Sequence, residues 1–177
     1  MSRLPAKTRD ALRPNQQALH DHFNETVRRT VGQDPGNVDS SSHQDSRQAA
    51  IGGPFPFLAV LPTVGRISLD LLAGLQEAVK TLPADARETV SLVCASHFKA
   101  TYVAQAHAKI ATSASLLTEA QIDGIASGTK PRDLSVASGF AYDTSCHLLN
   151  VRGPLPSGLW DQCVGTFGTE GTAGLVH

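Results

Sequence analysis

The stretch LPADARETVSLVCASHFKATYVAQAHAKIATSASLLTEAQIDGI, residues 82–125, decides the fold. It contains two runs in which apolar residues recur every three or four positions, the spacing that places side chains on one face of a helix. Pro83 and an acidic turn behind it indicate the start of the first helix. Residues 100–113 are expected to form the second helix. Thr118-Glu119-Ala120-Gln121 has the form of a capping box, which predicts that a third, short helix begins there.

Two more helices are predicted upstream of this stretch. Residues 8–31 have apolar positions at four-residue steps, with Pro14 tolerated in an early turn. Residues 64–80 have a stronger apolar pattern and are expected to form a core helix. The face that we expect this helix to bury consists of Val64, Ile67, Leu71, Leu72, Leu75 and Val79.

Downstream, the pattern predicts a helix that starts with Pro131 in its first turn and reaches Val151. Ser157 is then expected to cap a last helix, which Gly168 and the residues after it break. No segment shows the strict alternation of apolar and polar residues that marks a strand. The sequence therefore predicts an all-α protein built as a helical bundle.

The predicted organisation has two parts. Residues 1–53 combine a helical arm with a polar, serine-rich loop that has almost no large apolar side chains. Residues 54–177 are expected to form the helical domain that carries any site. A chain of 177 residues is ordinarily one domain with one core, to which arms and loops are added.

Composition excludes several classes of function. The net charge is −1 and the 15 Lys and Arg residues are scattered, so nucleic-acid binding is not expected. No apolar run is long enough to span a membrane, and the first residues lack the apolar segment of a secretory signal. We therefore expect a soluble, cytoplasmic protein without a membrane partner.

The cysteines fit neither a disulfide framework nor a metal site. Cys94, Cys146 and Cys163 are an odd number and are far apart in the sequence. Zinc sites normally have pairs of cysteines at short spacing, which are missing here. Buried free thiols are expected, and no metal.

A histidine and a carboxylate remain as candidates for chemistry, because the sequence has no phosphate-binding loop, zinc-protease motif, paired-cysteine motif or nucleophile elbow. Glu88 lies in the first predicted turn of one helix, and His107 lies on the apolar face of the next. An antiparallel hairpin would bring them together. The alternative readings are a hydrogen-bonded core histidine and a glutamate that only stabilises a helix start.

Residues 82–125, with SGTKPRDL (127–134) and RGPLPSGLWDQCVGTFGTEGTAGLV (152–176) after them, resemble the carboxymuconolactone decarboxylase-like family, which includes alkyl hydroperoxidase D. The resemblance extends from about Leu61 to the end of the chain, and Gly52-Gly53-Pro54 is similar to the family's Gly-Pro segment before its first core helix. The residues that match the family's site are Arg87, Glu88, Tyr102 and His107.

The chain departs from the family in two places. The peroxidase branch has cysteines seven and four residues before the histidine, where this sequence has Ala100 and Val103. Without a thiolate and a resolving thiol, thiol peroxidase activity is not expected. Cys94 is more simply a structural thiol than a substitute. At the other end, the family usually has one more apolar helix, and its loss is expected to expose apolar surface.

The resemblance implies a cofactor-free carboxy-lyase that acts on a lactone or a related small carboxylic acid. It implies that His107 donates a proton, that Glu88 orients its ring, and that the Tyr102 hydroxyl holds the substrate or an enolate oxygen. Arg87 would pair with a substrate carboxylate, unless it is a surface residue. A homo-oligomer is also implied.

Two other functions stay open. The same acid-base pair would serve a cofactor-free isomerase or cyclase, since those reactions also pass through enolates. A non-catalytic scaffold that acts through its oligomeric surface is the other alternative. We expect structural or surface roles for His97, Lys99 and His147.

Overall fold

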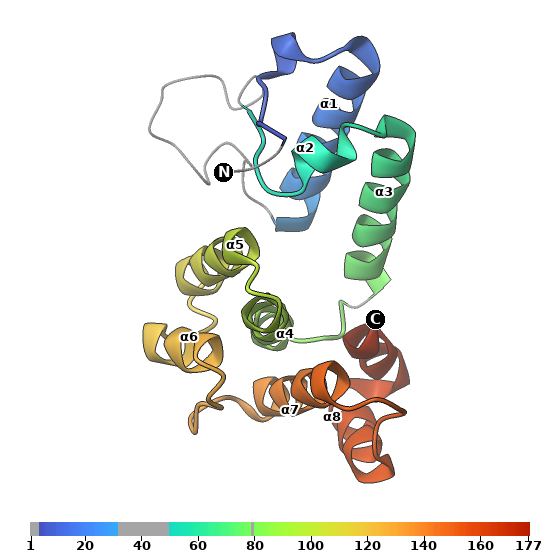
Figure 1. The fold of residues 1–177 in the computed structure, drawn as a ribbon. Coiled ribbons are helices and arrows are strands. Elements are labelled where there is room, and N and C mark those ends of the chain that lie inside the picture. Colours follow the sequence, from blue (N-terminus) through green and yellow to red (C-terminus); the bar gives the residue numbers. More distant parts are fainter. Residues whose placement is uncertain (1–3, 32–49, 79) are drawn as a thin grey trace. The chain divides into compact units, whose positions relative to one another are not determined.

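The computed structural model describes residues 4–31, 50–78 and 80–177, and every regular element in these ranges is a helix (Figure 1). This confirms the predicted all-α class. The chain divides into two compact units, unit 1 from Met1 to Glu77 and unit 2 from Ala78 to His177. The polar loop predicted before Gly53 lies largely outside the described ranges.

Unit 1 is built around Phe55. A short 3-10 helix, η1 (Arg9–Ala11), precedes α1 (Pro14–Val31), and α2 (Phe55–Leu58) and α3 (Pro62–Ala78) follow. The Phe55 ring makes edge-on contacts with His20 and Phe23 of α1. The single helix predicted over residues 8–31 is therefore divided, with Pro14 as the first residue of α1, where its missing N–H costs nothing.

The expected buried face of α3 was wrong for four of its six residues, whereas Leu75 is half-buried and Val79 lies outside the described residues. Val64, Ile67, Leu71 and Leu72, here called the apolar stripe of α3, are all more than half exposed. The opposite side packs instead, through Gly65, Leu69 and Ala73. A Cβ on Gly65 would lie 2.8 Å from the Leu58 carbonyl oxygen. Apolar residues lie on both sides of this helix, so periodicity alone did not identify the side that packs.

Unit 2 is centred on α4 (Figure 1). This helix contacts α5, α6 and α7, and α7 in turn packs against α8. Two apolar clusters result, one around Ala86, Ala141 and Cys163 and the other around Leu92 and Ala111. The helices are α4 (Ala84–His97), α5 (Thr101–Ser113), α6 (Glu119–Ala126), α7 (Val136–Asn150) and α8 (Ser157–Val176).

The capping box at the start of α6 is confirmed. The Thr118 hydroxyl accepts a hydrogen bond from the Gln121 backbone N–H at 3.2 Å, and the Gln121 side chain accepts one from the Thr118 N–H at 2.9 Å. The prediction that Pro131 opens the next helix was wrong. The helix α7 begins at Val136, because the hydroxyl of Ser135 caps it by accepting the Ser138 N–H at 3.0 Å.

The last helix also differs from its prediction. Ser157 is its first residue rather than its cap, and its side chain makes no capping bond. Gly168 breaks the helical geometry with a φ of 71°, as only glycine does readily. The helix then resumes and reaches Val176, and Leu175 is buried in the cluster around Ala86. The predicted end of the helix is therefore a kink.

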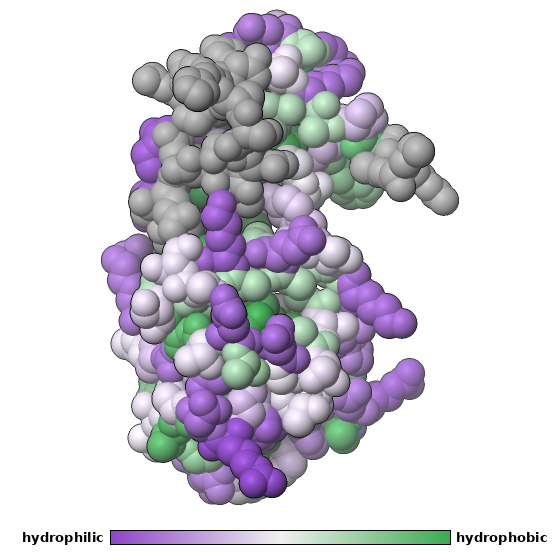
Figure 2. Space-filling model, turned by 90° about the vertical axis from the view of Figure 1, so that its left-hand side faces the viewer, coloured by the Kyte–Doolittle hydropathy of each residue, from purple (hydrophilic) through white to green (hydrophobic). Residues whose placement is uncertain are grey.

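The surface is mixed. On the face drawn in Figure 2, hydrophilic and apolar residues are interspersed over short distances. Within the described parts of the chain, no helix is long and apolar enough to cross a membrane.

Candidate functional site

The helices α4 and α5 form a tight antiparallel hairpin. Phe98, Lys99 and Ala100 connect them, and Lys99 adopts a left-handed φ of 53°. The Ala100 N–H donates to the Ala95 carbonyl at 2.8 Å, which closes the turn. Because the chain reverses here, residues of α4 and α5 on either side of the turn can face one another. Glu88 lies ten residues before Phe98 and His107 lies seven residues after Ala100.

The hairpin joins these two residues by a hydrogen bond. His107 Nδ1 lies 2.8 Å from Glu88 Oε2. The Glu88 side chain is 14% exposed and the His107 side chain is 30% exposed. A carboxylate accepts only, so Nδ1 carries the hydrogen and donates it. The neutral ring then has its lone pair on Nε2, which has no hydrogen-bond partner among the residues that the structure describes.

This arrangement can perform acid-base chemistry. A carboxylate on one ring nitrogen fixes the tautomer and stabilises the imidazolium, while the other nitrogen gives or takes a proton. Glu88 lies about one helical turn before Leu92, and His107 about one turn before Ala111; Leu92 and Ala111 belong to one apolar cluster. The prediction that the two residues come together is confirmed, and their catalytic roles stay predictions.

Asp85, which the sequence places in the acidic first turn together with Glu88, performs the helix-start role that was open for Glu88. It lies in the first turn of α4, whereas Glu88 lies one turn later. Its Oδ2 accepts hydrogen bonds from the hydroxyls of Ser135 and Ser138, and so ties α4 to α7. Burial favours the neutral acid, but these hydrogen bonds outweigh it and hold the pKa of Asp85 below its ordinary value of 3.8.

Tyr102 and Arg87 differ from Glu88 and His107 in position on their helices and in exposure. Tyr102 lies five residues before His107, about 140° around the helix axis, and is 43% exposed. Arg87 precedes Glu88 and is half-buried rather than solvated. Its Nε is buried and has no hydrogen-bond partner within the described parts of the chain. A buried, unsatisfied donor is costly, so Arg87 is available to an acceptor that enters the site.

The three cysteines are free, as expected, but only Cys163 is buried, and Cys94 and Cys146 are half-buried. Burial raises the pKa of Cys94, and the nearby Cys146 raises it further. Burial likewise raises the pKa of Cys146. Cys163 is fully buried, and its Sγ lies 3.1 Å from the Thr144 hydroxyl. Protonated, partly covered thiols are poor nucleophiles.

A second histidine-carboxylate pair was not predicted from the sequence. His22 Nε2 of α1 lies 2.7 Å from Asp70 Oδ1 of α3, in unit 1. The two residues are 48 positions apart, and no local pattern joins them. Across the described ranges, no group of three or more His, Cys, Asp or Glu residues is arranged to hold a metal ion.

No family model, curated protein or solved structure matches this chain. The resemblance of residues 82–176 to the carboxymuconolactone decarboxylase-like family therefore stays a prediction. The proposed function rests on the geometry of the hairpin between α4 and α5.

Proposed function

We propose that unit 2 is a cofactor-independent carboxy-lyase that acts on a lactone or a related small carboxylic acid, with His107 as its acid-base residue. The observation that carries the proposal is the 2.8 Å hydrogen bond between His107 Nδ1 and Glu88 Oε2. It leaves Nε2 as the ring atom that can exchange a proton. The resemblance to the decarboxylase-like family supplies the substrate class.

The reaction needs only a proton donor and an atom that accepts one electron pair. As the bond to the carboxylate carbon breaks, carbon dioxide leaves and the electron pair moves through the conjugated system onto the lactone carbonyl oxygen. The protonated His107 ring then gives its Nε2 proton to carbon, and the electron pair returns to form the C–H bond. Solvent protonates the ring again. Glu88 stabilises the imidazolium throughout.

Arg87 has a supporting role in this proposal, whereas Tyr102, about 140° around α5 from His107, has none. The guanidinium of Arg87 has a buried, unsatisfied Nε–H that suits a substrate carboxylate. We also propose a cytoplasmic location, because the free thiols Cys94, Cys146 and Cys163 suit a reducing compartment.

The proposal is tested by incubating the protein with unsaturated carboxy-lactones in deuterated water. NMR follows the release of carbon dioxide and the appearance of carbon-bound deuterium. The His107→Ala variant should lose turnover, and His97→Ala, which changes an exposed histidine at the end of α4, should keep it. Equal turnover in His107→Ala and the unchanged protein would refute the assignment.

The apolar stripe of α3 favours a second function, that of an oligomeric interaction protein. Four large apolar side chains, all more than half exposed, follow one another along one helix face. Contiguous apolar surface of this kind marks an interface more often than a solvent-facing helix. In this reading a second copy covers the stripe. Sedimentation of Ile67→Lys and Leu71→Lys variants checks it, since both should dissociate an oligomer that the unchanged protein forms.

A further inference from the structure

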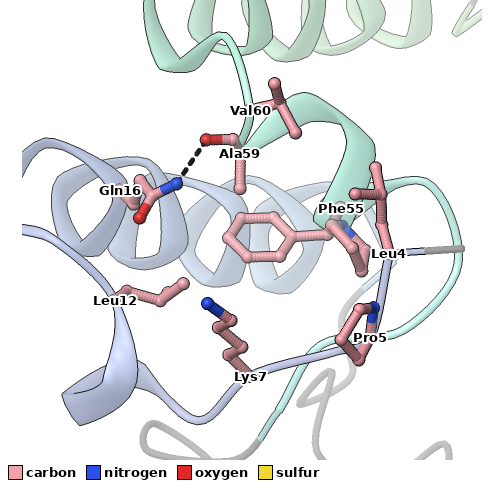
Figure 3. Close-up of a pocket in the computed structure, with 9 residues that line it drawn as sticks. Leu4, Pro5, Lys7, Leu12, Gln16, Phe55, Ala59 and Val60 are labelled. Carbon is pink, nitrogen blue, oxygen red and sulfur yellow. Dashed lines mark hydrogen bonds between the residues drawn. The ribbon is translucent and has the colours of Figure 1, made fainter.

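A cavity of about 230 Å³ opens in unit 1, on residues that the proposed catalysis does not use (Figure 3). Its walls come from the segment before η1, from the start of α1 and from α2. They are mainly apolar, with Leu12, Phe55 and Ala59 at the base, and each of these three side chains is less than one tenth exposed. The other wall residues are partly or largely exposed, so a small ligand would be covered on the side of Leu12, Phe55 and Ala59 and open to solvent on the other.

Two polar side chains line this cavity, and they differ in whether they are already hydrogen-bonded within the protein. The Gln16 amide is already used, since Nε2 donates to the Ala59 carbonyl at 2.7 Å and Oε1 accepts the Arg13 N–H at 3.1 Å. The Lys7 ammonium points into the space between Leu12 and Phe55 (Figure 3). In the described parts of the chain it forms no ion pair, so it is the charge that remains to recognise a ligand.

We infer that this cavity binds a small carboxylic acid whose apolar body is about the size of a phenyl ring, with its carboxylate on the Lys7 ammonium. The apolar side chains accept the body, and the Lys7 ammonium beside Leu12 and Phe55 selects the charge. The site rests on different residues from the acid-base pair, and the inference does not depend on the proposed lyase.

The volume limits the size of the ligand. A cavity of about 150 Å³ holds benzene, and drug-sized ligands need about 300 Å³ or more. A volume of about 230 Å³ therefore suits one ring, or a short branched chain, with a small acidic group. Phenylacetate has this size and charge and is the probe of choice.

The test compares three probes that share a body and differ in charge. Phenylacetate, 2-phenylethanol and phenethylamine are titrated into the full chain, and binding is followed by NMR. Phenylacetate should bind with a Kd on the order of 1 mM. Because Lys7 is exposed to solvent, the acid should bind only about threefold to fivefold more tightly than the alcohol. The amine should bind most weakly.

Variants show which residue causes the acid to bind more tightly than the alcohol. Lys7→Gln should remove the difference between acid and alcohol, and Lys7→Arg should keep it. Lys99→Gln, which changes an exposed lysine of unit 2, is the matched control and should change nothing. The His107→Ala variant should bind phenylacetate normally, which separates this inference from the proposed catalysis. Bound phenylacetate should show magnetisation transfer to the Phe55 ring and the Leu12 methyl groups.

Three results would overturn the inference. The first is that phenylacetate does not bind at millimolar concentration. The second is that acid and alcohol bind equally to the unchanged protein, or that Lys7→Gln keeps the preference. The third is that magnetisation transfer reaches unit 2 and not Phe55, which needs no variant and so does not depend on how a variant folds.

Discussion

The two units each contain a histidine hydrogen-bonded to a carboxylate, and the two pairs are built in opposite ways. In unit 1 the His22 side chain is 14% exposed and Asp70 is 54% exposed. In unit 2 the carboxylate of Glu88 is 14% exposed and His107 is 30% exposed. The distances, 2.7 and 2.8 Å, are nearly equal. The pairs therefore differ in which partner faces water, not in the length of the hydrogen bond.

This difference separates a structural pair from a pair suited to catalysis. A covered imidazole held by an exposed carboxylate links α1 to α3, and Arg66 Nε also lies 3.8 Å from Asp70. Solvent screens such a carboxylate and weakens its effect on the ring. A covered carboxylate under a more open imidazole does the opposite, because its field on the ring is less screened and the second nitrogen can meet a substrate.

The largest expected effect is on turnover. Glu88→Gln should lower kcat about tenfold to hundredfold, a part of the 10²–10⁴-fold that a positioned acid or base contributes. The matched variant Asp70→Asn in unit 1 should leave kcat unchanged. Steady-state kinetics on the carboxy-lactone that proves to be a substrate checks both. An equal loss in the two variants would break the distinction between the pairs.

The next effect concerns packing. Gly65→Ala in unit 1 should destabilise the protein by about 1–3 kcal/mol, because the new Cβ would lie 2.8 Å from the Leu58 carbonyl oxygen and 2.9 Å from Leu19 Cδ2. Gly165→Ala in α8 meets nothing within 4 Å and should stabilise its helix by up to about 1 kcal/mol. Thermal unfolding followed by circular dichroism measures both. A neutral Gly65→Ala would contradict the close approach of α3.

Acid should destabilise unit 2 through Asp85. The pKa of Asp85 is below 3.8 in the folded protein, so its contribution is fully present above pH 3.8 and is lost as the pH falls through the folded value. Asp85→Asn should cost about 1–2 kcal/mol at pH 6 and progressively less as the pH falls through the folded pKa of Asp85, below 3.8. Urea unfolding followed by the fluorescence of Trp160 on α8 reports this unit. Asp161→Asn, at an exposed position, is the control.

The smallest effect is on stability at the two pairs themselves. Glu88→Ala removes a largely covered hydrogen-bond acceptor and should cost about 1–2 kcal/mol. Asp70→Ala removes an exposed one and should cost less than about 0.5 kcal/mol. Equilibrium unfolding of the two variants, together with hydrogen exchange of α3 and α5, compares them. If Asp70→Ala proves the more destabilising, exposure is not what distinguishes the pairs.

The sequence predicts the helices of unit 2 well because their signals are local. The capping box at Thr118 and the three-to-four-residue spacing in α4 and α5 depend on neighbouring residues only. The pairing of Glu88 with His107 followed from one further assumption, an antiparallel hairpin with a short turn. The start of α7 was missed, since Pro131 and Ser135 are both acceptable helix openings and the contact of Ser135 with Asp85 decides between them.

Unit 1 was harder to predict because its features are not local. The apolar stripe of α3 has a core-like pattern, and the burial of Leu69 and Ala73 and the approach of Gly65 to Leu58 show that the other side packs. The pair His22–Asp70 and the cavity at Lys7 join segments that are distant in the sequence. Neither has a spacing that a single sequence reveals.

The most direct test of the central claim is the tautomer of His107. Nitrogen-15 NMR of histidine-labelled protein distinguishes a ring that is protonated on Nδ1 from one protonated on Nε2. We expect neutral His107 to carry its hydrogen on Nδ1, facing Glu88, and Glu88→Ala to shift the population toward Nε2. A ring protonated on Nε2 in the unchanged protein, or one that Glu88→Ala does not alter, would contradict the account of the site.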